Sequence, residues 1–200
     1  MIADASLKRD PQSGPPAPST LPQPKPVHPD IALREEEQLF TGRFFDVYRQ
    51  AATLPSGLKQ DWQFVTHAGA SAIAALDDQG RMLMVRQYRL PIADWSVEIP
   101  AGRLEVGEAP LLAAQRELEE ETGYRASNWE PFFEFVPAPG FCSEVVHVFL
   151  AQGLEVVPGG GLACDEDEEL EVLWMRPEEV LELTPADSKT QLAAFRVLAR

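Results

Sequence analysis

Cysteine and histidine are scarce in this sequence, which contains only two cysteines and three histidines. The cysteines, Cys142 and Cys164, have neither metal-ligand spacing nor the pattern of a disulfide framework. The histidines, His28, His67 and His147, show no metal-ligand spacing either. A chain without a disulfide framework fits a reduced compartment, and we therefore expect a cytoplasmic protein.

Long apolar runs are absent. The sequence has no uninterrupted apolar stretch of about 18 residues, which is roughly what a membrane-spanning helix needs. The first ten residues also lack the apolar segment of a secretory signal. We therefore expect neither a membrane partner nor export.

Positive charge is also scarce. The sequence contains 17 Lys and Arg residues but 32 Asp and Glu residues, which gives a formal net charge of -15. A DNA or RNA polymer is thereby disfavoured as a partner, since phosphate backbones are bound by lysine and arginine. An acidic site that handles phosphates must obtain its cations elsewhere, and a divalent metal is the usual source.

Proline is abundant, and its distribution divides the chain. Eight of the 18 prolines fall in the first 30 residues, a composition typical of a flexible arm with polyproline segments. A ligand for a proline-binding domain is the less favoured alternative for residues 1–30. We expect a strand region over 31–66 and the main domain over 67–200, where a hydrophobic content of 44% for the whole chain allows a real core.

Strand patterns dominate the folded part, and they alternate only irregularly with helices. Strands are predicted over 43–50, 61–67, 70–76, 81–88, 95–102, 130–140, 144–152 and 170–175, with a hairpin turn at 77–80. Helices are predicted over 110–122, 176–183 and 188–200. This order predicts an α+β fold, a mixed β-sheet with helices on its faces.

The helix at 110–122 carries an unusual acidic side. Glu117, Glu120 and Glu121 are neighbours at i+3 and i+4, where each like-charge pair costs about 0.2–0.5 kcal/mol. They also lie toward the helix C-terminus, where the helix dipole favours cations. Both the like-charge pairs and the acids near the helix C-terminus are locally unfavourable, and such unfavourable placements indicate a functional site. Three apolar residues gather on the side expected to face the sheet: Leu111, Ala114 and Leu118.

For an arbitrary glutamate cluster, a solvated acidic face is the favoured interpretation. Here, however, a glycine-bearing loop at 100–108 leads directly into the helix and places Glu108 at its entrance. Three carboxylates beside such a loop match the oxygen ligands that Mg²⁺ prefers.

At this point the spacing resembles the signature of the Nudix hydrolases. The matching positions are Gly102, Glu108, Arg116, Glu117, Leu118, Glu120, Glu121 and Gly123. The one departure is Tyr124, where the general pattern has an aliphatic residue. The resemblance implies a Nudix-type mixed β-sheet sandwiched between helices (α/β/α), with an N-terminal antiparallel strand extension. It also implies that water attacks a phosphorus of a nucleoside diphosphate derivative with the help of Mg²⁺, or alternatively Mn²⁺.

The roles implied by the family fall on the same positions. Glu117 and Glu121 would be the principal metal ligands, together with the backbone carbonyl of Ala101, and Glu120 would lie close by. Arg116 would orient the glutamates by hydrogen bonding, and Glu108 would support it by pairing with Arg116.

Two further stretches resemble the ADP-ribose pyrophosphatase group: "VRQYR" at 85–89 and "PAPGFCSE" at 137–144, with Pro139 and Gly140 at the expected distance from the signature. This resemblance implies conversion of ADP-ribose to AMP and ribose 5-phosphate. Arg89 would contact the phosphates, although a strand arginine in an ion pair is an equal alternative. Glu98 would lie on the substrate or metal side and Glu144 near the terminal ribose, the alternative being ordinary strand-end acids.

The acidic run at 164–172 is the expected place for a general base. The resemblance favours Glu166 as the base and Glu168 as a further metal-side acid. The neighbouring acids Asp165, Asp167 and Glu169 are alternatives, and composition alone favours a mobile acidic loop without a catalytic role.

The resemblance further implies a homodimer that exchanges N-terminal strands. One alternative function is hydrolysis of another nucleotide sugar, such as GDP-mannose. Another is a non-catalytic nucleotide-sensing module, which is disfavoured because the chain keeps every glutamate of the signature.

Overall fold

The computed structural model describes residues 29–159 and 170–200. The predicted arm, except for its last two residues, and the predicted residues Glu166 and Glu168 lie outside the described residues. The strands are β1 (Ala32–Thr41), β2 (Asp46–Thr53), β3 (Lys59–Thr66), β4 (Ala70–Ala75), β5 (Met82–Arg89), β6 (Asp94–Glu98), β7 (Ala101–Arg103), β8 (Tyr124–Phe135), β9 (Val146–Val156) and β10 (Glu171–Met175). The helices are α1 (Pro110–Thr122), α2 (Pro177–Leu181), α3 (Ser188–Leu198) and a short 3-10 helix at Leu90–Ile92. Within these residues no helix is both long and apolar enough to cross a membrane.

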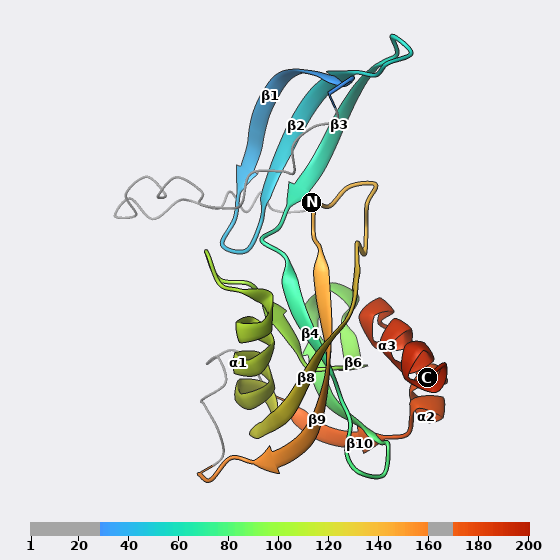
Figure 1. Cartoon of the computed structure of the whole chain (residues 1–200). Coiled ribbons are helices and arrows are strands. Elements are labelled where there is room, and N and C mark those ends of the chain that lie inside the picture. The colour runs from blue at the N-terminus through green and yellow to red at the C-terminus, as the bar shows by residue number, and fades with distance from the viewer. Residues whose placement is uncertain (1–28, 160–169) are drawn as a thin grey trace, which may run out of the picture.

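Strands β1, β2 and β3 form an antiparallel sheet that stands apart at one end of the molecule (Figure 1). The turn between β2 and β3 is closed by a hydrogen bond from the Gly57 N–H to the Leu54 carbonyl, 2.8 Å long. Gly57 has a φ of 83°, a conformation that side chains disfavour. The β1–β3 sheet leads into the rest of the molecule through the end of β3.

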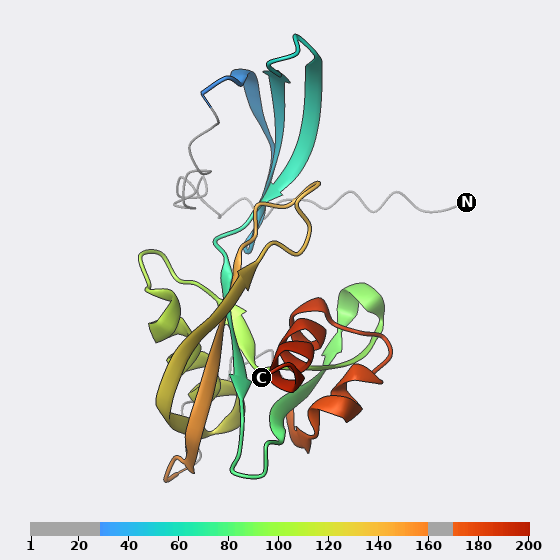
Figure 2. The same cartoon turned by 45° about the vertical axis from the view of Figure 1, so that its right-hand side comes forward.

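The body contains two sheets. One is mixed, in the order β7-β4-β9-β8, with β4 parallel to β9 and the other pairs antiparallel. The second is antiparallel, in the order β10-β5-β6. Figures 1 and 2 show α1 on one side of the mixed sheet and α2 and α3 on the other.

The predicted hairpin between β4 and β5 forms only in part. Its turn is present, since the Asp77 N–H donates to the Arg81 carbonyl over 3.0 Å. Beyond a single bridge between Leu76 and Met82, however, the two strands join different sheets. The reason is that β7 and β9 already occupy both edges of β4.

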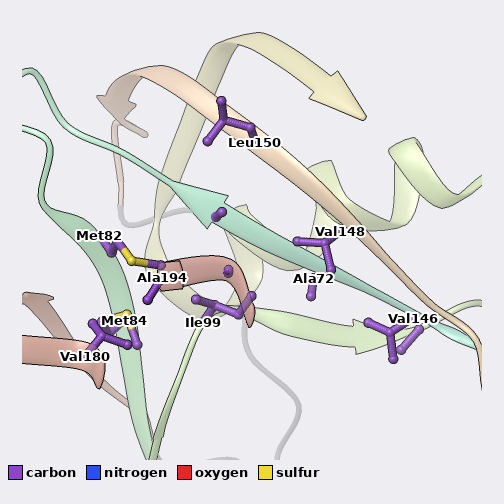
Figure 3. Packing of buried hydrophobic residues seen from close by; sticks show 12 residues of the cluster. Ala72, Met82, Met84, Ile99, Val146, Val148, Leu150, Val180 and Ala194 are labelled. Carbon is purple, nitrogen blue, oxygen red and sulfur yellow. The ribbon is translucent and has the colours of Figure 1, made fainter. Parts of the chain in front are cut away.

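The core follows from the alternation of β4, whose successive side chains point to opposite faces. Ala70, Ala72 and Ala74 pack in one cluster, in which Figure 3 shows residues of β5, β9, α2 and α3 around Ile99. Ile73 and Ala75 point the other way, into a cluster that includes residues of α1. Every residue of β4 is therefore buried, and the fold is the predicted α+β sandwich.

Helix α1 begins and ends where the sequence predicts. Pro110 occupies its first turn, and Gly123 ends it in the left-handed conformation with a φ of 70°. Leu118 and Ala114 are fully buried as expected, but the prediction for Leu111 was wrong, because that side chain is 38% exposed. Leu111 lies in the first turn, outside the cluster that the rest of the apolar side enters.

Replacing Leu118 tests how strongly α1 is fixed by its packing. Because Leu118 is fully buried, we expect Leu118→Ala to lower the free energy of unfolding by about 2–5 kcal/mol in a urea titration. Leu112→Ala is the matched control, since Leu112 lies on the same helix but is 58% exposed, and it should change stability by no more than about 0.5 kcal/mol. Equal effects of the two substitutions would contradict this packing.

Candidate active site

The C-terminal half of α1 lies against β7. The Ala101 N–H donates to a carboxylate oxygen of Glu121 over 2.9 Å, and Glu121 is only 5% exposed. The segment before β7 is fixed in turn by β4, because the Ile73 N–H donates to the Pro100 carbonyl over 2.9 Å. The buried strand β4 thus sets where β7 meets α1.

One guanidinium gathers three of the carboxylates. Arg116 Nη1 donates to Glu117 over 2.7 Å and to Glu120 over 2.8 Å. Its Nε and Nη2 each donate to Glu108 over 3.1 Å. The hydrogen bond to Glu108 does most to raise the pKa of Arg116, with Glu117 and Glu120 adding to it. The arginine therefore supplies a permanent positive charge where α1 concentrates acids.

Gly102 faces the carboxylate of Glu117. A Cβ at this position would overlap the carboxylate atoms of Glu117, so only glycine leaves room for that carboxylate. The glycine thus serves close approach: β7 can lie against the acidic side of α1 because it carries no side chain there.

The donor chemistry of this cluster fits a hard divalent cation, because such ions prefer carboxylate and carbonyl oxygens. The present geometry differs, since within the described ranges no three His, Cys, Asp or Glu side chains are arranged to hold a metal together. The physical reason is Arg116, toward which Glu117 and Glu120 are turned. Carboxylates at the ends of glutamate side chains rotate easily, so the same donor set can turn its oxygens toward an ion.

A second charged group adjoins the first. Glu98, whose side chain is 5% exposed, accepts two hydrogen bonds from Arg89, at 2.9 and 2.8 Å, and one from Lys189 Nζ at 2.5 Å. Burial by itself would raise the pKa of Glu98, but the hydrogen bonds and charges of Arg89 and Lys189 outweigh burial and lower it. Glu98 ends β6 and lies three residues before Ala101, whose N–H donates to Glu121, so the second group is joined to the first by a short segment of chain. The charge of Glu121 also helps to raise the pKa of Arg89.

Sequence reasoning missed Lys189 entirely. It is the second residue of α3 and lies 91 positions from Glu98 along the chain. A single lysine in the first turn of a surface helix carries no signal of its own. The nearest signal is Asp187, which caps α3 by accepting from the Thr190 N–H over 3.0 Å and thereby fixes where the helix begins.

The loop that carries Pro139, Gly140 and Glu144 lies beside the end of β3. The Val65 N–H donates to the Phe141 carbonyl over 2.7 Å and fastens the loop there. Glu144 lies 3.5 Å from His67 Nδ1. Burial lowers the pKa of His67, with Arg103 adding to the effect and Glu144 opposing it, so His67 is uncharged at neutral pH.

The predicted residues thus fall into two places. The structure brings together those of α1, β7 and the Arg89–Glu98 pair: Ala101, Glu108, Arg116, Glu117, Glu120, Glu121, Arg89 and Glu98. Pro139, Gly140 and Glu144 lie in the loop beside β3. Arg103 is near both, because its carbonyl accepts from Arg116 over 3.2 Å and it pairs across the sheet with Ala70, three residues after His67.

Comparison with known proteins bears on this site. The family model described as the NUDIX domain matches residues 65–195. An ADP-ribose pyrophosphatase of Bacillus subtilis is 43% identical over 162 residues, which are 79% of this chain and 87% of that protein. An ADP-ribose pyrophosphatase of Mycobacterium tuberculosis is 41% identical over 72% of this chain and 70% of its own length. The solved structure of an ADP compounds hydrolase, at 21% identity, has a TM-score of 0.74 and covers 85% of this chain and 93% of its own, a similarity of fold.

Gly102→Ala tests the close approach of β7 to α1. The added methyl group would displace the Glu117 carboxylate, which is the far end of a side chain and can move without disturbing the fold. We expect binding of Mn²⁺, measured by electron paramagnetic resonance, to weaken by about 10- to 100-fold, while the melting temperature stays near that of the unsubstituted protein. Unchanged Mn²⁺ affinity would contradict a role for this volume in ion binding.

Proposed function

The chain belongs to the Nudix family of hydrolases, and from that membership we propose that it hydrolyses the diphosphate bond of ADP-ribose to AMP and ribose 5-phosphate. The observation that carries the proposal is the cluster on α1 and β7 in a chain 43% identical to an ADP-ribose pyrophosphatase over most of both lengths. The remaining predicted residues then receive roles around that cluster.

Nudix hydrolases depend in general on a divalent metal, and we propose Mg²⁺ here, with Mn²⁺ as the alternative. Glu117, Glu121 and the carbonyl of Ala101 would hold it, joined by Glu168 from outside the described residues. When bound, the ion would neutralise charge on the diphosphate and lower the pKa of a water. Arg116 and Glu108 orient the ligands, and Glu120 stays within hydrogen-bonding distance of the same guanidinium.

The other residues would bind substrate and move a proton. Arg89, with 41% of its side chain exposed, would donate to diphosphate oxygens, and its bonds to Glu98 hold it nearby before substrate binds. Glu144, with Pro139 and Gly140 in the same loop, would contact the terminal ribose. Glu166, outside the described residues, would accept the proton of the attacking water as the new oxygen–phosphorus bond forms.

A panel of substrates tests the reaction. With Mg²⁺ present, we expect ADP-ribose to give a higher kcat/KM than GDP-mannose, other nucleoside diphosphate sugars and dinucleotides, with AMP and ribose 5-phosphate as products by chromatography. A higher kcat/KM for GDP-mannose would contradict the assignment of ADP-ribose and identify GDP-mannose as the preferred substrate.

Substitution of the proposed metal ligands, measured in the same assay, tests their assignment. Glu117→Gln and Glu121→Gln should each lower kcat by several orders of magnitude, because an amide is a much weaker ligand than a carboxylate. Neither change should unfold the protein, since glutamine has the size of glutamate and keeps an oxygen that can accept from Arg116 at position 117 or from the Ala101 N–H at position 121. Near-normal rates in both variants would show that the ligands lie elsewhere.

We also propose that the chain is a homodimer joined through residues 31–66, with residues 67–200 as the hydrolase domain. The β1–β3 sheet and its turns expose a set of large apolar side chains, which is unusual for a surface that faces only water. The set comprises Leu33, Leu39, Phe40, Phe44, Phe45, Leu58 and Trp62. A second copy of the same sheet is the occupant implied by the family. The cytoplasmic location expected from the sequence stays a prediction.

Phe40→Asp tests the dimer. Phe40 is 54% exposed, and a carboxylate at a buried interface would carry a large desolvation penalty. Sedimentation equilibrium should show a dimer for the unsubstituted protein and a monomer for Phe40→Asp. Val156→Asp, at the far end of β9 and 65% exposed before substitution, should remain dimeric. A dimer that survives Phe40→Asp would locate the interface elsewhere.

A further inference from the structure

We propose that Lys189 is a positioning residue that neutralises Glu98 whenever Arg89 leaves that carboxylate to bind the substrate's diphosphate. The inference rests on the proposed function in one respect, which is that Arg89 contacts the diphosphate. It adds a residue that neither the sequence pattern nor the family signature indicates.

Glu98 has two cationic partners that differ in access to solvent. Arg89 bonds both carboxylate oxygens, and its side chain is 41% exposed. Lys189 bonds one of the same oxygens, and its side chain is only 14% exposed. Arg89 is therefore the partner that a solute can reach, whereas Lys189 is largely shielded from solvent.

Lys189 is also carried by a rigid element. The hydroxyl of Thr190, a fully buried residue, donates to Asp187 over 2.6 Å and accepts from the Ile99 N–H over 2.9 Å. The first turn of α3 is thus fastened to the residue that follows Glu98. Asp187 lies 3.0 Å from Lys189 Nζ and helps to hold the ammonium group. Lys189 consequently stays beside Glu98 when the longer, more exposed Arg89 moves.

Such a partner has a role because Arg89 binds Glu98 with the same pair of N–H groups that suits a bidentate contact with phosphate. A guanidinium that spends Nε and Nη2 on one carboxylate cannot use the same N–H groups on a phosphate. Turning them to a diphosphate would leave Glu98 buried without a counter-ion, which is strongly unfavourable. With Lys189 in place the carboxylate keeps a charged donor, so Arg89 can exchange one anion for another at little loss.

Lys189→Met removes the charge while keeping the length of the side chain. Steady-state kinetics should use whichever panel substrate the unsubstituted protein hydrolyses best, so that an error about ADP-ribose does not affect the result. We expect KM to rise by about tenfold or more, as for loss of a hydrogen bond to a charged group, and kcat to change much less. Lys189→Arg should restore KM. Arg196→Met is the control. It removes a positive charge from the same helix, at a side chain that lies over the Phe133 ring, and should leave KM unaltered.

Glu98→Gln provides the second arm, because a neutral amide needs no counter-ion. KM should be the same in Glu98→Gln and in the double variant Glu98→Gln, Lys189→Met, and this pair remains informative if Lys189→Met alone fails to fold. A further rise of KM in the double variant would overturn the inference.

The remaining outcomes separate this inference from the proposed function. If Arg89→Met raises KM but Lys189→Met does not, Arg89 reaches the phosphate while still bonded to Glu98, and only the role of Lys189 is overturned. If Arg89→Met leaves KM unchanged, the phosphate contact of the proposed function fails and the inference fails with it. If another substrate outperforms ADP-ribose while the Lys189 effects appear as expected, only the substrate assignment is lost.

Discussion

The attraction between one guanidinium and three carboxylates is the interaction on which this site depends. Glu117, Glu120 and Glu108 converge on Arg116, and without that charge their repulsion would oppose both α1 and its contact with β7. The like charges near the end of α1 are tolerated because Arg116, a residue of the same helix, neutralises them. It also leaves the carboxylates close together, where a divalent cation has ligands of the type it prefers.

Strand β4 turns that local chemistry into a fixed geometry. Its side chains alternate between two clusters, one under α1 and one under α2 and α3, so both faces of the mixed sheet are held. The backbone of β4 also fixes the segment before β7 through the Pro100 carbonyl. Glu98 therefore meets α3 through Lys189, whereas Ala101 and Gly102 lie against α1. The position of the site is a consequence of packing, and its charges are a consequence of side chains placed on that frame.

Local signals in the sequence predicted local structure well. Pro110 and Gly123 bound α1 because each acts within its own turn. The β4–β5 hairpin was overestimated, because a turn signal at 77–80 says nothing about which strands compete for the edges of β4. Leu111 was misplaced for a similar reason: the helical wheel gives a direction but not where the neighbouring sheet stops.

By itself the sequence determined the class of fold, the acidic side of α1 and the Nudix signature, since all of these are written in spacings of a few residues. Only the tertiary structure decided that Glu98 has two cationic partners and that one of them, Lys189, comes from 91 positions away. The same holds for the volume that Gly102 leaves beside Glu117. Contacts of this kind depend on how separate elements pack, and packing places side chains together that no local pattern relates.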